Sequence, residues 1–151
     1  MNTEPSFSER FADGTSSLIH QNQQVRPMLL LAVNHHSKIR VQRIAARSDR
    51  RQALKLAASN GTLELAGASA EIVSLWADTS PKTVELLVNG PRVRWLEVWN
   101  AWDIGGLETA WLGNSGIITE SAEQHLTLHC SDGLDDPSFS DLQVAISVSN
   151  Q

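Results

Sequence analysis

Short segments in which apolar and polar residues alternate recur along the chain from Val25 onward. In the last of them, Leu142, Val144, Ile146 and Val148 take every second position, which places them on one face of a β-strand. Turn-forming residues separate such segments about every ten positions, a spacing typical of sandwiches and barrels. We therefore predict an all-β fold, an antiparallel, jelly-roll-like β-sandwich of about nine or ten strands, with a β-barrel as second choice. The other predicted strands lie near residues 28–33, 38–44, 54–56, 63–65, 72–76, 84–88, 93–100, 117–120 and 125–130.

The dipeptide Asn60-Gly61 gives the strongest hairpin signal in the chain, because alternating segments flank it on both sides. Both central residues of a type I′ turn take positive φ, a conformation that Asn and Gly tolerate well. We therefore expect the strands before and after this dipeptide to pair with each other. An amphipathic helix over residues 43–58 is the alternative for the first of them, and the Ser48-Asp49 break argues against it.

The first 24 residues are polar and show no sustained period, so we predict a flexible N-terminal tail there. Residues 25–151 are then expected to form a single β-sandwich domain. The N-terminal sequence lacks the charged and apolar regions of a signal peptide. We therefore expect a cytoplasmic protein, or one exported without a recognisable signal peptide.

The charges are divided unevenly, although the formal net charge is only −5. Residues 38–55, which we call the basic stretch, carry seven of the twelve Lys and Arg residues. From Trp95 to the C-terminus there are nine Asp and Glu residues and no Lys or Arg. The net charge argues against nucleic-acid binding. The asymmetry could steer a charged partner, or it could reflect two solvated faces of opposite sign.

Residues 95–116 hold four of the five tryptophans in a chain that has no tyrosine. Alternation places Trp95, Glu97 and Trp99 on one face of a strand, opposite Leu96 and Val98. If that face is outward, the indoles form an exposed platform with a carboxylate acceptor, as recognition surfaces do. If it is inward, they fill a core that has few other aromatic residues. Both alternatives stay open at this point.

Beyond this strand, residues 100–106 read as a loop that closes a hairpin, and residues 113–116 read as a second turn. Both loops could meet at one edge, which would group Trp102, Asp103 and Asn114. Polar oxygens beside an indole can hold a sugar or a polar peptide, whereas a packing tryptophan among turn residues is the plainer alternative. The candidate ligand-binding residues are Trp95, Glu97, Trp99, Trp102, Asp103, Glu108, Trp111 and Asn114.

The acidic loop over residues 131–141 contains Asp132, Asp135, Asp136 and Asp141. Ca²⁺ binds six to eight oxygen ligands from such loops, so a calcium site is one prediction and a solvated loop is the alternative. The spacing does not match an EF-hand. The single cysteine, Cys130, is expected to point inward and to be inert.

These patterns favour a non-enzymatic, lectin-like recognition module that binds a glycan or a protein partner through its tryptophan-rich surface. A membrane-lipid-binding or toxin-like β-sandwich is the first alternative. A small hydrolase with Glu97 and Glu108 as an acid–base pair is the second alternative, although the chain has no G-x-S-x-G motif.

Overall fold

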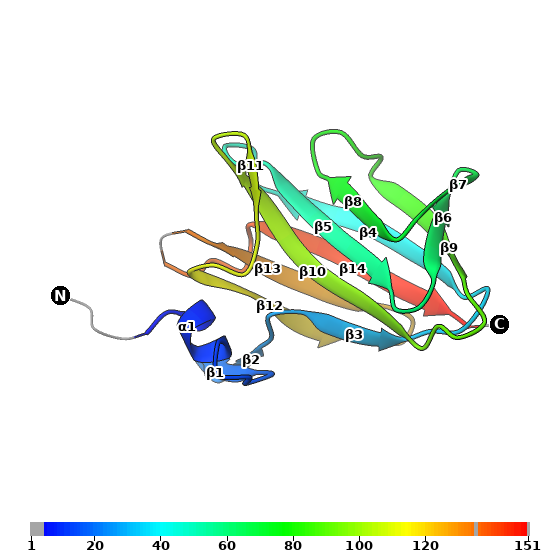
Figure 1. Ribbon diagram of the computed structural model, residues 1–151. Helices are drawn as coiled ribbons and strands as arrows, with labels where there is room; N and C mark the ends of the chain where they lie inside the picture. Colours follow the sequence, from blue (N-terminus) through cyan, green and yellow to red (C-terminus); the bar gives the residue numbers. More distant parts are fainter. Residues whose placement is uncertain (1–4, 135, 151) are drawn as a thin grey trace.

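The computed structural model describes residues 5–134 and 136–150 of the chain. Within this part, the chain forms two large antiparallel β-sheets packed face to face, together with one short helix and a small hairpin (Figure 1). The prediction of an all-β sandwich is confirmed, and the sheets do not close into a barrel. No helix in the described residues is long and apolar enough to cross a bilayer.

The elements are α1 (Phe7–Phe11), β1 (Leu18–His20), β2 (Gln23–Val25), β3 (Leu29–Ala32), β4 (Lys38–Ala46), β5 (Gln52–Ala58), β6 (Thr62–Leu65), β7 (Ala68–Ala70), β8 (Ile72–Trp76), β9 (Thr83–Asn89), β10 (Trp95–Ile104), β11 (Leu107–Thr109), β12 (Asn114–Ser121), β13 (Leu126–Gly133) and β14 (Leu142–Ser149).

The five-stranded sheet lies in front of the seven-stranded sheet in Figure 1. In the front sheet, β5 pairs with β8 on one side and with β10 on the other, and both β3 and β11 pair with the opposite edge of β10. The strand order of the back sheet is β12-β13-β14-β4-β9-β6-β7. The strand β10 is therefore central to the front sheet, because all its length is paired.

Alternation along the strands supplies the apolar layer between the two sheets. Leu142, Val144 and Ile146 of β14 are buried, as their period-two pattern predicts, and Val148 packs partly against them. The basic stretch is strand rather than helix at both ends, in β4 and β5. Cys130 is fully buried, and this burial raises the pKa of its thiol, in agreement with an inert side chain.

The predicted hairpin at Asn60-Gly61 is wrong. Among the described residues, the strand β5 pairs only with β8 and β10 of the front sheet, whereas β6 pairs with β7 and β9 of the back sheet. Asn60 does take a positive φ of 59°, but the turn carries the chain from one sheet to the other. Gly61 is needed there for a different reason, because a Cβ atom would lie 2.6 Å from the carbonyl oxygen of Asn89.

The described part of the expected N-terminal tail, residues 5–24, is folded against the sandwich. Ser6 caps α1 by accepting a hydrogen bond from the Glu9 N–H (3.3 Å), and β1 and β2 form a hairpin. Phe7 and Leu18 are buried in a second apolar cluster with Val25 and Ile118 of β12. Residues 1–4 lie outside the described part of the chain.

Candidate functional site

The outer face of β10 carries Trp95, Glu97 and Trp99, while Leu96 and Val98 point between the sheets. The tryptophan-bearing face of this strand is therefore outward, yet its two indoles differ. Trp95 is half exposed, whereas Trp99 is only 8% exposed. Trp99 is covered because the ring of Trp111 stacks on it, with centroids 5.3 Å apart and an interplanar angle of 25°.

Trp111 reaches this position through an unusual backbone conformation after β11. Its φ is +57°, in the left-handed region that costs a non-glycine residue about 1–2 kcal/mol. Two contacts offset this cost: the stacking on Trp99, and a hydrogen bond that its indole Nε1 donates to the Pro27 carbonyl (3.0 Å). The indole of Trp111 is thereby fixed, with one side against Trp99.

A buried lysine lies beside this pair of indoles. Lys55 is the register partner of both Trp99 and Ser74, so its side chain shares the outer face with them. Its Nζ donates to Ser74 Oγ (2.6 Å) and to both carboxylate oxygens of Glu108 (2.9 and 3.1 Å). The predicted ligand-binding carboxylate of Glu108 is therefore already paired, and the hydrolase alternative would require it to leave Lys55.

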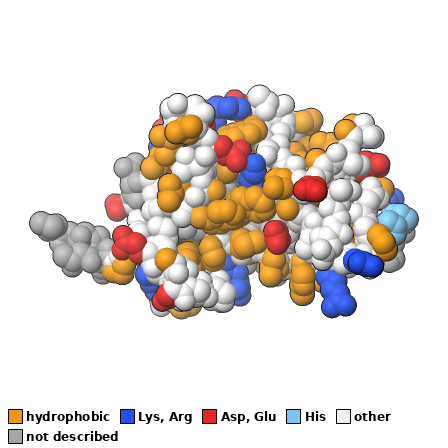
Figure 2. All heavy atoms as spheres, viewed as in Figure 1, with side chains coloured by type: hydrophobic (Ala, Val, Ile, Leu, Met, Phe, Trp, Pro, Cys, Tyr) orange, Lys and Arg blue, Asp and Glu red, His pale blue; other side chains and the backbone are white. Residues whose placement is uncertain are grey.

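Large apolar side chains remain exposed around this centre. Leu30 (56%), Ile72 (52%), Trp95 (46%) and Trp111 (45%) are all on the front sheet or over it. Leu30 on β3 is the register partner of Glu97 on β10. Ile72 lies on β8, which pairs with the opposite edge of β5. Figure 2 shows the resulting band of hydrophobic side chains across the middle of this face. We call this surface the tryptophan face, with Leu30, Ile72, Trp95, Trp99 and Trp111 as its apolar members.

The expected group of Trp102, Asp103 and Asn114 is not formed. The strand β10 continues to Ile104, so Trp102 points between the sheets and is fully buried, whereas Asp103 points outward. Asn114 begins β12 in the other sheet, and its Oδ1 accepts a hydrogen bond from the Phe7 N–H (3.1 Å). Asn114 thus anchors the N-terminal segment, and the loop predicted over residues 100–106 is reduced to the turn at Gly105-Gly106.

Sequence reasoning did not identify Lys55, Ser74, Leu30 or Ile72 as part of this surface. Each occupies the outward position of an alternating strand, which is an available but nonspecific signal. These residues become neighbours only because β3, β5, β8 and β10 pair, and local periodicity does not predict which distant strands pair.

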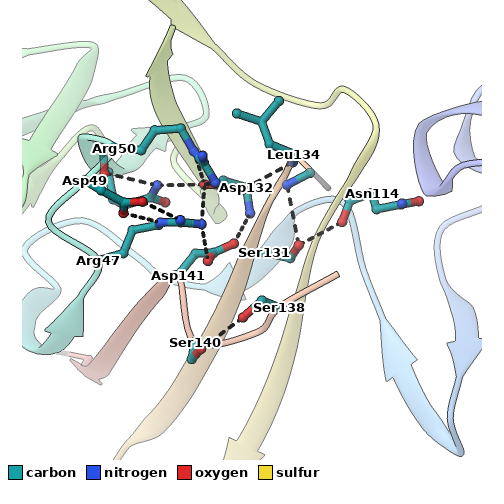
Figure 3. Close-up of polar contacts among 12 residues, drawn as sticks. Arg47, Asp49, Arg50, Asn114, Ser131, Asp132, Leu134, Ser138, Ser140 and Asp141 are labelled. Atoms are coloured by element: carbon teal, nitrogen blue, oxygen red, sulfur yellow. Dashed lines mark hydrogen bonds and ion pairs between the residues drawn. The ribbon is translucent and has the colours of Figure 1, made fainter. Parts of the chain in front are cut away.

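The acidic loop folds into an ion-pair network instead of an open cluster of carboxylates (Figure 3). Asp132 is completely buried; its Oδ2 accepts from Arg50 Nε (2.6 Å) and Gln52 Nε2 (3.0 Å). Its Oδ1 accepts from the Leu134 N–H (3.2 Å). Asp141, also buried, accepts from Arg47 Nη1 (3.1 Å) and from the Asp132 N–H (2.9 Å). All four carboxylate oxygens are therefore engaged by the protein itself.

The pKa values of the two buried carboxyl groups are shifted in opposite directions. Burial alone would raise the pKa of Asp132, but hydrogen bonds from Arg50, the Leu134 N–H and Gln52 bring the pKa below its ordinary value. Burial also raises the pKa of Asp141, and the charge of Asp132 beside it raises this pKa further. Arg47 lies between them and lowers the repulsion.

These contacts also explain the uneven charge distribution of the sequence. The basic stretch is joined to the acidic C-terminal part by the pairs Arg47–Asp141, Arg50–Asp132 and Lys55–Glu108. Neither expectation from the sequence, a steering field or two solvated faces, describes these residues. They are cross-links between strands that are distant in the chain.

We expect millimolar calcium to leave the melting temperature unchanged. Ca²⁺ would have to displace arginine and amide donors from Asp132 and Asp141, and Asp136 is exposed. In residues 5–134 and 136–150, no group of three or more His, Cys, Asp or Glu side chains could hold a metal ion; Asp135 lies outside them. The check is thermal unfolding with calcium and with EDTA; a rise in calcium that EDTA reverses would contradict the expectation.

Comparison with known proteins finds no family model that matches this chain and no similar curated protein. The function must therefore be inferred from the geometry of the surface alone.

Proposed function

We propose that this protein is a non-enzymatic recognition module that binds a partner protein through the tryptophan face. The observation that carries the proposal is the exposure of Leu30, Ile72, Trp95 and Trp111 on one side of the front sheet. Contiguous exposed apolar patches are uncommon on monomers and mark interaction surfaces. Tryptophan is also among the residues that contribute most to binding at interfaces.

The architecture beneath the patch supports binding without a large rearrangement. Trp111 is held between Trp99 and the Pro27 carbonyl, and Lys55 is held by Ser74 and Glu108. Side chains that are already fixed lose little conformational entropy when a ligand covers them. The surface is thus prepared before the partner arrives.

The chemistry of the patch favours a protein over a sugar. A sugar requires several free donors and acceptors, but Lys55, Ser74 and Glu108 are bonded to one another. Glu97 is the carboxylate beside Leu30, and it forms no ion pair within the described residues. We therefore infer that the partner presents apolar side chains with a Lys or Arg placed to face Glu97.

We expect Trp95→Ala to weaken binding of the partner by about 2 kcal/mol or more, roughly thirtyfold in Kd, as loss of an interface hot spot does. The experiment compares proteins retained from a cell extract by the wild type, by Trp95→Ala and by Arg92→Ala. Arg92 is exposed in the turn between β9 and β10, is not a member of the tryptophan face, and serves as the control. A supporting partner is retained by the wild type and the control, is lost with Trp95→Ala, and shows the same difference when its purified form is titrated.

A partner that all three proteins retain equally would move the interface to another surface. Binding of immobilised glycans that requires Trp95 would replace the protein partner with a sugar. Co-sedimentation with liposomes would favour the membrane alternative, and Leu107 (71% exposed), near the β10–β11 turn, would then be the first contact to test.

A further inference from the structure

A groove of about 810 Å³ lies on the outer face of the seven-stranded back sheet, on the side of the sandwich away from the tryptophan face. Its floor is formed by the outward side chains of β4, β9 and β14, including Lys38, Arg40, Glu85 and Ser147. Glu64 of β6 and Gln124 of the β12–β13 loop lie at its two sides. We call this feature the polar groove. Its volume is within the range of small-ligand sites, about 300–1,000 Å³.

The groove is extended rather than confined to one pocket. A second hollow of about 340 Å³ shares three lining residues with it: Arg40, Gln124 and Ser147. Gln42 and His125 line the continuation. A ligand made of several repeated units could therefore contact both hollows at once.

Strand register sets the order of the polar groups on the floor. Arg40 lies between Glu85 of β9 on one side and Ser147 of β14 on the other. Two positions earlier on β4, Lys38 lies between Leu87 and Ser149. Cationic, acidic and hydroxyl groups are thus side by side in neighbouring rows, about 7 Å apart along each strand.

Within the described residues, the charged groups of the groove have no partners, unlike the other basic residues of the basic stretch. Arg47, Arg50, Arg51 and Lys55 are all paired with carboxylates. Across the part of the chain that the structure describes, five charged side chains of the groove form neither an ion pair nor a side-chain hydrogen bond: Lys38, Arg40, Glu64, Glu85 and Glu123.

We propose that the polar groove binds a neutral oligosaccharide. The guanidinium of Arg40, the carboxylate of Glu85 and the amide of Gln124 each present paired donors or acceptors, which suit neighbouring hydroxyl groups of a sugar. Leu87 and Ala145 supply apolar contacts for the C–H surface of the ring. This site is separate from the tryptophan face and does not depend on the function proposed there.

The charges and the pairing of the floor strands disfavour other ligands. Two cations and three carboxylates in one groove repel part of any polyanion or polycation. A peptide cannot join the floor as an additional strand, because β4 already pairs with β14 and β9, and β9 also pairs with β6. A neutral ligand rich in hydroxyl groups is not repelled by these charges and does not need to pair with a strand of the floor.

The test is titration of the isotope-labelled protein with linear hexamers of glucose, mannose, galactose, xylose and N-acetylglucosamine at millimolar concentrations, followed by NMR. We expect at least one hexamer to shift the backbone signals of Arg40, Gln124 and Ser147. Arg40→Ala and Gln124→Ala should each weaken that binding about tenfold or more, which corresponds to about 1.4 kcal/mol. Arg92→Ala, a change in an exposed turn outside the groove, should leave it unchanged.

The variants concern exposed side chains, so their thermal unfolding should match that of the wild type, and a loss of binding then reports on contact. The proposal is overturned if no hexamer shifts these signals, or if the shifts appear around Trp95 instead. It is also overturned if only a control peptide such as Gly-Lys-Glu-Gly, or only a sulfated hexamer, binds at Arg40. Apart from shifts around Trp95, none of these results bears on the partner protein of the tryptophan face, whose test uses Trp95→Ala.

Discussion

Replacing Trp102 with alanine should lower the free energy of unfolding by about 3–5 kcal/mol, the range for removing a large buried aromatic side chain. Trp102 is fully buried, on the inward face of β10 beside its register partner Gln52. Its indole Nε1 has no hydrogen-bond partner within the described residues, so the loss comes from packing and from the cavity left behind. Chemical denaturation measures the change directly.

The matched control for this substitution is Trp95→Ala in the same strand. Trp95 lies on the outward face and is half exposed, so its truncation should change the free energy of unfolding by less than about 1 kcal/mol. A one-residue shift in the register of β10 would exchange the two faces of the strand. Equal losses in the two variants, or a larger loss for Trp95→Ala, would therefore contradict the register of β10 with β5.

The faces of the strands could be predicted from the sequence because period two is a local property. The alternation of residues 142–148 identifies the buried face of β14, and that of residues 95–99 places Trp95 and Trp99 on a common face. Which sheet a strand joins is a different question. At Asn60-Gly61 the local turn chemistry is compatible with a hairpin, but β5 and β6 bury their apolar faces from opposite sides of the core.

The candidate surface was only half predictable for the same reason. Alternation places Trp99 on the same face as Trp95 but does not say whether that face is outward, and the burial of Trp99 depends on Trp111, which takes a positive φ after β11. Residue types alone do not specify that conformation. The face is outward rather than part of the core between the sheets, but its two indoles differ: Trp95 is exposed, and Trp99 is covered by Trp111.

The ion pairs between the acidic loop and the basic stretch could not be predicted from either segment alone. The acidic loop suggests a calcium site when seen alone, and the basic stretch suggests a separate surface. The ladder from β13 through β14 to β4 brings Asp132 and Asp141 to Arg47 and Arg50, which are more than 80 positions away. Sequence separation of this kind carries no local signal, so the pairing is visible only in the folded chain.

Replacing Asp132 with alanine should cost about 3–5 kcal/mol of folding free energy, because it leaves the other half of a buried ion pair without compensation. Arg50 would lose its carboxylate acceptor, and Gln52 Nε2 would keep only its longer hydrogen bond to the Arg50 carbonyl oxygen (3.4 Å). Asp49→Ala is the matched control: Asp49 also pairs with an arginine, Arg47 at 2.7 Å, but it is exposed and should change stability far less. Similar losses for both variants would contradict the assigned role of burial.

A second variant separates the leftover charge from the lost contact. Adding Arg50→Met to Asp132→Ala should recover part of the stability, because the unpaired guanidinium is then removed from its partly buried site. If the double variant is less stable than Asp132→Ala by the full effect of Arg50→Met in the wild type, the two residues are not coupled. Urea denaturation of the four proteins of the cycle decides between these results.

The contribution of Asp132 should also depend on pH in a defined direction. Its pKa in the folded protein is below the ordinary 3.8, so the stability that it contributes is fully present above this value and is lost as the pH falls through the folded pKa. Asp141 acts in the opposite sense, because its pKa in the folded protein is raised above 3.8. Its protonated form therefore stabilises the fold at low pH, and this contribution is lost as the pH rises from 3.8 through the folded pKa. The difference in unfolding free energy between the wild type and Asp132→Asn, in which Asp141 is retained, should therefore shrink when the pH is lowered from about 7 to about 3. A difference that stays constant over this interval would show that the charge of Asp132 does not stabilise the fold.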